Sequence, residues 1–96
     1  MIVVNVMIET TADDIAKVKD AIATMEKASQ AEEGCHDYTF SVELNNPNRI
    51  RITEKWESME VLEKHFGMPH MATFQQALAS ITMKGSDMNF YEATPV

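Results

Sequence analysis

Alternation between apolar and polar positions predicts four strands along this chain. Residues 2–9, IVVNVMIE, are apolar on both faces, which is typical of a central strand covered on two sides. Residues 35–44 alternate more cleanly, which predicts a half-buried edge strand whose apolar face carries Tyr38, Phe40, Val42 and Leu44. The turn residues 45–48, NNPN, lead into residues 49–57, so we expect these two strands to form a β-hairpin. The last strand is expected over residues 87–93.

Apolar residues at helical spacing predict two helical stretches between the strands. The first follows Thr11 as N-cap, ends at Gly34 and buries a stripe formed by Ile15, Val18, Ile22 and Met25. The second follows Ser58 as N-cap, is broken at Gly67 and resumes at Pro69, and its buried side carries Met59, Leu62, Phe66, Met71, Phe74 and Leu78. The order β-α-β-β-α-β is the ferredoxin-like α+β pattern with an antiparallel sheet, and we expect one domain over residues 1–96.

Composition excludes several classes of partner. Eight Lys and Arg residues face fifteen Asp and Glu residues, and this net charge of −7 argues against nucleic acid and against an anionic membrane surface. No apolar run approaches the roughly 18 residues of a membrane span, and the N-terminus lacks the basic flank of a signal peptide. Cys35 is the only cysteine, so an internal disulfide is impossible, and we expect a cytoplasmic protein.

The candidate chemistry lies in residues 54–70, which hold two of the three histidines and the only tryptophan. Glu54 shares a strand face with Ile52 and Trp56, so its carboxylate is expected to point into dry surroundings and to need a partner. His65 falls in the last turn of one helix, where the helix dipole favours the protonated ring, and His70 in the first turn of the next, where it favours the neutral ring. The two rings could therefore divide base and acid roles beside Glu54.

Each of these residues also has a purely structural interpretation. A histidine beside an apolar stripe is commonly a core-edge residue, and Glu54 could accept a hydrogen bond from a backbone N–H or a histidine for structural reasons, or could orient a catalytic imidazole. Asn5 interrupts an apolar strand and is a pocket candidate, whereas Glu32 and Glu33 are expected to be solvated. No Cys/His set has a zinc spacing, so we expect no metal site.

Three segments together resemble the antibiotic biosynthesis monooxygenase family, and most closely its small quinol-monooxygenase-like members. They are residues 32–38 (EEGCHDY), 52–65 (ITEKWESMEVLEKH) and 69–77 (PHMATFQQA). The resemblance implies a homodimer in which two ferredoxin-like sheets form a dimeric α+β barrel, with a pocket between sheet and helices in each subunit. It also implies oxidation of a quinol or polyphenol by O2 without flavin, haem or metal, so that no cofactor is expected.

The resemblance assigns residues to this pocket. It implies catalytic roles for Asn5, Glu54, His65 and His70, and substrate-binding roles for the apolar and aromatic side chains Tyr38, Trp56, Phe66, Met68 and Phe74. Haem degradation, found in another branch of the superfamily, is not expected, because residues 73–76 read TFQQ and offer no axial histidine. Two alternatives remain open: a non-oxidative isomerase or lyase with the same base, and a non-catalytic small-molecule binding module.

Overall fold

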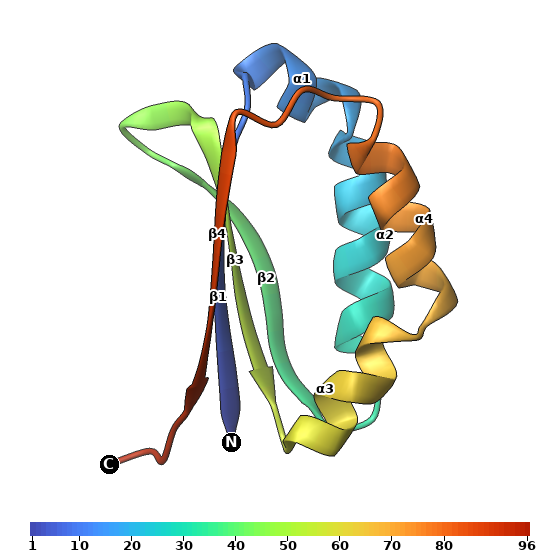
Figure 1. Cartoon of the computed structure of the whole chain (residues 1–96), viewed down its shortest axis with the longest axis vertical. Coiled ribbons are helices and arrows are strands. Elements are labelled where there is room, and N and C mark those ends of the chain that lie inside the picture. The colour runs from blue at the N-terminus through green and yellow to red at the C-terminus, as the bar shows by residue number, and fades with distance from the viewer.

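In the computed structural model, which describes all 96 residues, a four-stranded antiparallel sheet is covered by helices on one face (Figure 1). The elements follow the predicted order, and the second helical stretch is broken at Gly67 as predicted, but the first stretch is also divided in two. They are β1 (Ile2–Glu9), α1 (Ala12–Lys17), α2 (Lys19–Gln30), β2 (Cys35–Glu43), β3 (Asn46–Trp56), α3 (Met59–Phe66), α4 (Pro69–Leu78) and β4 (Gly85–Glu92). The ferredoxin-like α+β prediction is confirmed. None of the helices combines the length and hydrophobicity that crossing a bilayer requires.

The strand order β2-β3-β1-β4 places β1 in the centre and β2 at an edge, as the residue patterns predict. Alternate residues of β1 face the helices and are buried, namely Ile2, Val4, Val6 and Ile8. No helix lies on the other face of the sheet (Figure 1), where Asn5 is exposed. The expectation that β1 is covered on both sides is therefore wrong for the single chain.

The predicted apolar face of the β2–β3 hairpin is buried only along part of its length. Tyr38 is 2% exposed, but Val42 is 48% and Leu44 96% exposed. The end of the hairpin bends away from the helices (Figure 1), in agreement with the exposure of the side chains there. On α3, Met59 and Phe66 were also expected on the buried side and are 42% and 44% exposed.

Hydrogen-bonded caps begin the helices where the sequence predicts. Thr11 Oγ1 accepts the backbone N–H of Asp14, and Ser58 Oγ accepts that of Val61. The first helical stretch is not continuous, because Val18 leaves helical geometry (φ −105°, ψ 11°) and its N–H turns to Ile15 O at 3.2 Å. The predicted N-caps are therefore the residues at which the helices begin, whereas no pattern in the sequence predicted the division at Val18.

Gly34 sets the approach of α3 to the loop that follows α2. Its φ of +82° lies in the left-handed region that favours glycine, and a Cβ there would lie 2.8 Å from Val61 Cγ1 on α3. Its carbonyl also accepts the N–H of Glu57 at 2.8 Å. This turn brings the α2–β2 loop, which carries Glu32, directly against α3.

We predict that Gly34→Ala lowers the free energy of unfolding by about 2 kcal/mol or more, because it adds both backbone strain and a clash. Gly67→Ala is the matched control, since Gly67 has a negative φ and a Cβ there would meet only Lys64 O at 3.7 Å. Urea unfolding of the two variants measures the difference. Equal stabilities would contradict the role given to Gly34.

Candidate active site

The strand register lines up one row of side chains that face the helices. Val4 of β1 pairs with Glu54 of β3 and with Phe90 of β4, and Glu54 pairs with Tyr38 of β2. Above this row, between the sheet and the helices α3 and α4, lies a cavity of about 120 Å³. Its lining is apolar except for Glu54 and Gln75, and comprises Val4, Val6, Ile8, Tyr38, Ile52, Glu54, Phe66, Met71, Phe74, Gln75, Leu78 and Met88.

The cavity opens beside β4. Phe66 and Met88 both line it and are 44% and 54% exposed, and the ring of Phe66 stacks on that of Phe90 at 6.3 Å. A dry cavity of roughly 150 Å³ accommodates benzene, so this space is of the order of one aromatic ring. A larger ligand would extend past the side chains of Phe66 and Phe90 to the surface.

Glu54 is the ionisable group inside this cavity. It is 5% exposed, and its Oε1 accepts the indole N–H of Trp56 at 2.9 Å. The pKa of Glu54 is raised to about 7, chiefly by burial; the Trp56 hydrogen bond opposes this shift, and the charge of Glu32 contributes to it. A carboxylate with a pKa near neutrality can accept a proton from a substrate and return it.

Tyr38 forms a wall of the same cavity. Burial, followed by the charge of Glu54, raises the pKa of its phenol, which keeps the hydroxyl neutral. Its ring lies 5.3 Å from the ring of His65 and 6.1 Å from that of Trp56. Tyr38 therefore joins the cavity wall to the aromatic packing behind it.

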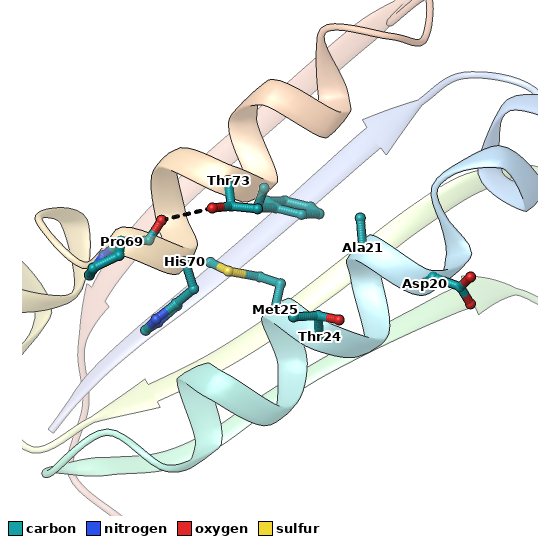
Figure 2. A pocket seen from close by; sticks show the side chains of 8 residues that line it. Asp20, Ala21, Thr24, Met25, Pro69, His70 and Thr73 are labelled. Carbon is teal, nitrogen blue, oxygen red and sulfur yellow. Dashed lines mark hydrogen bonds between the residues drawn. The ribbon is translucent and has the colours of Figure 1, made fainter.

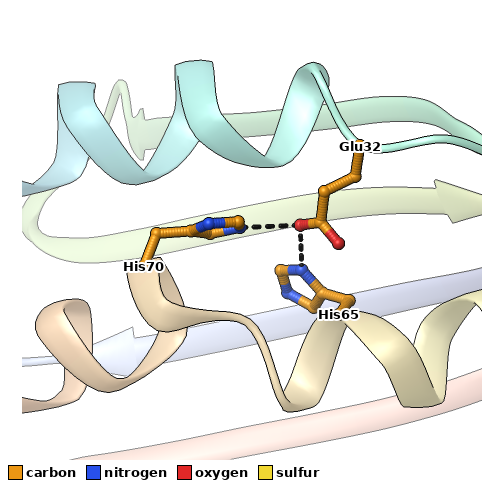
Figure 3. A group of neighbouring side chains, drawn as sticks. All are labelled: Glu32, His65 and His70. Carbon is orange, nitrogen blue, oxygen red and sulfur yellow. Dashed lines mark hydrogen bonds and ion pairs between the residues drawn. The ribbon is translucent and has the colours of Figure 1, made fainter.

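Behind the cavity, Glu32 lies between the two histidines (Figure 3). Its Oε2 is 2.6 Å from His65 Nδ1 and 2.7 Å from His70 Nε2. The side chains of Glu32 and His65 are 6% and 0% exposed, and that of His70 is 19% exposed. The expectation that Glu32 is solvated is therefore wrong, and Glu32, not Glu54, is the carboxylate that contacts both imidazoles.

Trp56 contacts both this cluster and Glu54. Its ring lies 4.5 Å from the ring of His65, while its N–H binds Glu54. The remaining nitrogen of His65, Nε2, is buried without a hydrogen-bond partner. Neither histidine lines the cavity, so the direct contact between imidazoles and substrate that the sequence suggested is not the observed arrangement.

The Glu32–His65–His70 cluster also has the composition of a metal site, since its ligand atoms all lie within 4.8 Å of one another. However, both imidazole nitrogens approach the same carboxylate oxygen at hydrogen-bond distances of 2.6 and 2.7 Å. Tetrahedral ligands about 2.1 Å from a zinc ion lie about 3.4 Å apart. The observed distances between the imidazole nitrogens and the carboxylate oxygen therefore fit direct hydrogen bonds better than joint coordination of a metal ion.

Comparison with known proteins identifies the family of this chain. The family model described as antibiotic biosynthesis monooxygenase matches residues 1–77. The chain belongs to the antibiotic biosynthesis monooxygenase family.

Sequence and structural relatives agree with this family. The Escherichia coli K12 protein named Probable quinol monooxygenase YgiN is 33% identical over 64% of this chain and 66% of its own length, just under two thirds. The family fold recurs in a Deinococcus radiodurans protein with a TM-score of 0.90 and 23% identity, covering 100% of this chain and 95% of that one. Rv0793 from Mycobacterium tuberculosis superposes with a TM-score of 0.86 at 16% identity, covering 99% and 96%.

Within this family member, the predicted site residues fall into five places. Glu54, Tyr38, Phe66 and Phe74 line the cavity, and Trp56 and His65 lie behind it. His70 lines a separate surface hollow of about 490 Å³ between α2 and α4, where it lies opposite Met25 and Thr24 (Figure 2). The last two predicted residues also lie away from the cavity: Asn5 lies on the opposite face of the sheet, and Met68 lines another hollow with Glu32 and Lys64.

The predicted site residues did not include Glu32 or eight of the residues that line the cavity, namely Val4, Val6, Ile8, Ile52, Met71, Gln75, Leu78 and Met88. Glu32 lies inside the EEGCHDY segment that carried the family resemblance, but beside Glu33 it has the appearance of an ordinary solvated charge. The β4 residue Met88 had no signal, because its contribution depends on the pairing of β4 with β1.

We predict that the stability cost of ionising Glu54 appears between pH 4.5 and pH 7. The folded carboxyl has a pKa of about 7 against an ordinary 4.5, so the folded state binds more protons in this range and loses stability as the pH rises. Below pH 4.5 the loss is absent, and above pH 7 it is complete at about 3 kcal/mol.

Glu54→Gln keeps an acceptor for Trp56 and cannot ionise, so its free energy of unfolding should not show this loss. Chemical denaturation of both proteins at a series of pH values measures the difference. A constant difference between them across the range would contradict the perturbed pKa of Glu54.

Proposed function

We propose that this protein is a cofactor-independent monooxygenase that oxidises a single-ring quinol or polyphenol with O2. The observation that carries the proposal is one carboxylate of raised pKa inside an apolar cavity the size of an aromatic ring. The relative named Probable quinol monooxygenase YgiN supports the substrate class.

In the proposed reaction Glu54 accepts the hydroxyl proton of the substrate. The resulting phenolate is electron-rich enough to transfer electrons to O2, and the apolar walls keep bulk water from its intermediates. One oxygen atom of O2 enters the ring and the other leaves as water, so a hydroquinone becomes a hydroxyquinone and itself supplies all four electrons. The protein therefore needs to provide a base, an enclosure and a way to remove the proton.

The surrounding residues have supporting roles in this proposal. The Trp56 N–H holds the Glu54 carboxylate in place, and the walls formed by Tyr38 and Phe74 pack against the substrate ring. His65 and His70 take part in proton transfer from behind Trp56 and do not contact the substrate. This assignment gives the base role to Glu54, where the sequence had favoured an imidazole.

A non-oxidative isomerase or lyase is the second candidate, because the same buried base could move a proton within a small metabolite. An oxygen electrode separates the two, since only the monooxygenase consumes O2 when a hydroquinone is added. Thermal stabilisation by hydroquinones without any turnover would instead indicate a binding module.

We also propose that two copies associate through the sheet face that the helices leave open, in the cytoplasm. Val3, Met7 and the 50% exposed Tyr91 lie on this face, where they would be covered in a dimer. A free, partly buried Cys35 suits a reducing compartment.

We predict that Glu54→Gln lowers kcat for hydroquinone oxidation by about 100-fold or more, which is the usual contribution of a general base. Glu57→Gln is the matched control, because Glu57 lies at the exposed end of the same segment and pairs only with His36. Oxygen consumption measures turnover, and thermal shift with the hydroquinone measures binding. Full activity in Glu54→Gln would eliminate Glu54 as the base.

A further inference from the structure

We propose that Glu32 is a positioning residue that holds His65 as a second, internal proton acceptor behind Glu54. In this arrangement His65 Nε2 takes the proton that Glu54 has removed from the substrate. The inference rests on the proposed function for the proton it handles, but the arrangement of hydrogens that it requires can be measured without turnover.

The hydrogen bonds to Glu32 determine where the hydrogens lie on the two rings. A carboxylate oxygen accepts hydrogen bonds, so His65 Nδ1 and His70 Nε2, which approach Glu32 Oε2 at 2.6 and 2.7 Å, both donate to it. A neutral imidazole carries one hydrogen, so His65 Nε2 is left with a lone pair. That atom is buried and has no partner, which is the condition of an unused proton acceptor.

Glu32 also supplies the charge that His65 needs after it accepts a proton. The His65 side chain is fully buried, and an imidazolium there is too costly without an adjacent anion. The carboxylate oxygen at Nδ1 provides this anion, in the way that an aspartate supports the histidine of a hydrolase triad. His70 makes the second hydrogen bond to the same oxygen and so fixes the carboxylate.

Trp56 brings the two proton acceptors together. Its N–H binds Glu54, and its ring lies 4.5 Å from the His65 ring, so one indole contacts both the carboxylate and the imidazole. Transfer between them requires one bridging water, because His65 does not line the cavity. The charge of Glu32 is also felt at Glu54, where it raises the pKa of that carboxyl.

The return of the proton completes the arrangement. The Glu32 carboxylate at Nδ1 balances the imidazolium charge while His65 carries the proton at Nε2. The proton goes back over the same bridge when the second oxygen atom of O2 leaves as water, and the lone pair at Nε2 is restored. One O–H bond of the substrate is broken and one O–H bond of that water is formed, so no net proton is released and the protein does not change its oxidation state.

The first experiment determines the histidine tautomers of the wild-type protein by ¹⁵N NMR. We expect hydrogen on Nδ1 and a lone pair on Nε2 in His65, and hydrogen on Nε2 in His70. A hydrogen on Nε2 of a neutral His65 would overturn the proposal. Displacement of both ring signals by one equivalent of Zn²⁺ would also overturn it, because the cluster would then be a metal site.

The second experiment compares Glu32→Gln with Glu33→Gln in hydroquinone oxidation. We expect at least a 10-fold lower kcat with unchanged KM in Glu32→Gln, because Glu32 does not line the cavity, and wild-type values in Glu33→Gln. A wild-type kcat in Glu32→Gln, or a change confined to KM, would overturn the positioning role.

Failure of the proposed function is distinguishable from failure of this inference. Absence of turnover by the wild-type protein with every quinol would eliminate the proposed function, whereas the tautomer measurement on the same sample would still decide the role of Glu32. The tautomer measurement also decides it if Glu32→Gln does not fold.

Discussion

The site depends on a carboxylate that has been removed from water. Glu54 lies in a row of side chains that otherwise meets the helices with apolar or aromatic groups, and its one hydrogen-bond donor is the Trp56 indole. A single neutral donor compensates only part of the lost hydration, so the charged form remains costly and the pKa of Glu54 rises to about 7. In the proposed function, this incomplete compensation is what allows Glu54 to exchange a proton near neutral pH.

Local backbone features assemble the second layer of the site. The positive φ of Gly34 turns the α2–β2 loop against α3, and the break between α3 and α4 at Gly67 presents His65 and His70 from two helix ends to the same carboxylate. The two histidines are five residues apart, so on a single straight helix they would not lie on the same face and could not both contact Glu32. The turn at Gly34 and the helix break at Gly67 are therefore as necessary to assemble the site as the regular helices and strands.

The antibiotic biosynthesis monooxygenase fold is retained at sequence identities of 16 to 23% among the solved structures compared. At that distance the shared property is the sheet and its helical cover, and the chemistry must be argued from the cavity. In this chain the cavity combines one ionisable group with aromatic walls and an opening between Phe66 and Met88. For the proposed function, those features favour a flat apolar substrate that has an acidic proton.

By itself the sequence determined the strands and helices, their order, the N-caps at Thr11 and Ser58, and the inward direction of Glu54, because each depends on local periodicity or on hydrogen bonds within a few residues. The tertiary structure alone decided that Glu32 is buried between His65 and His70, that Asn5 faces away from the cavity, and that Met88 forms part of its mouth. These contacts join residues far apart in the chain, through loop closure and strand pairing, and local patterns carry no information about such approaches.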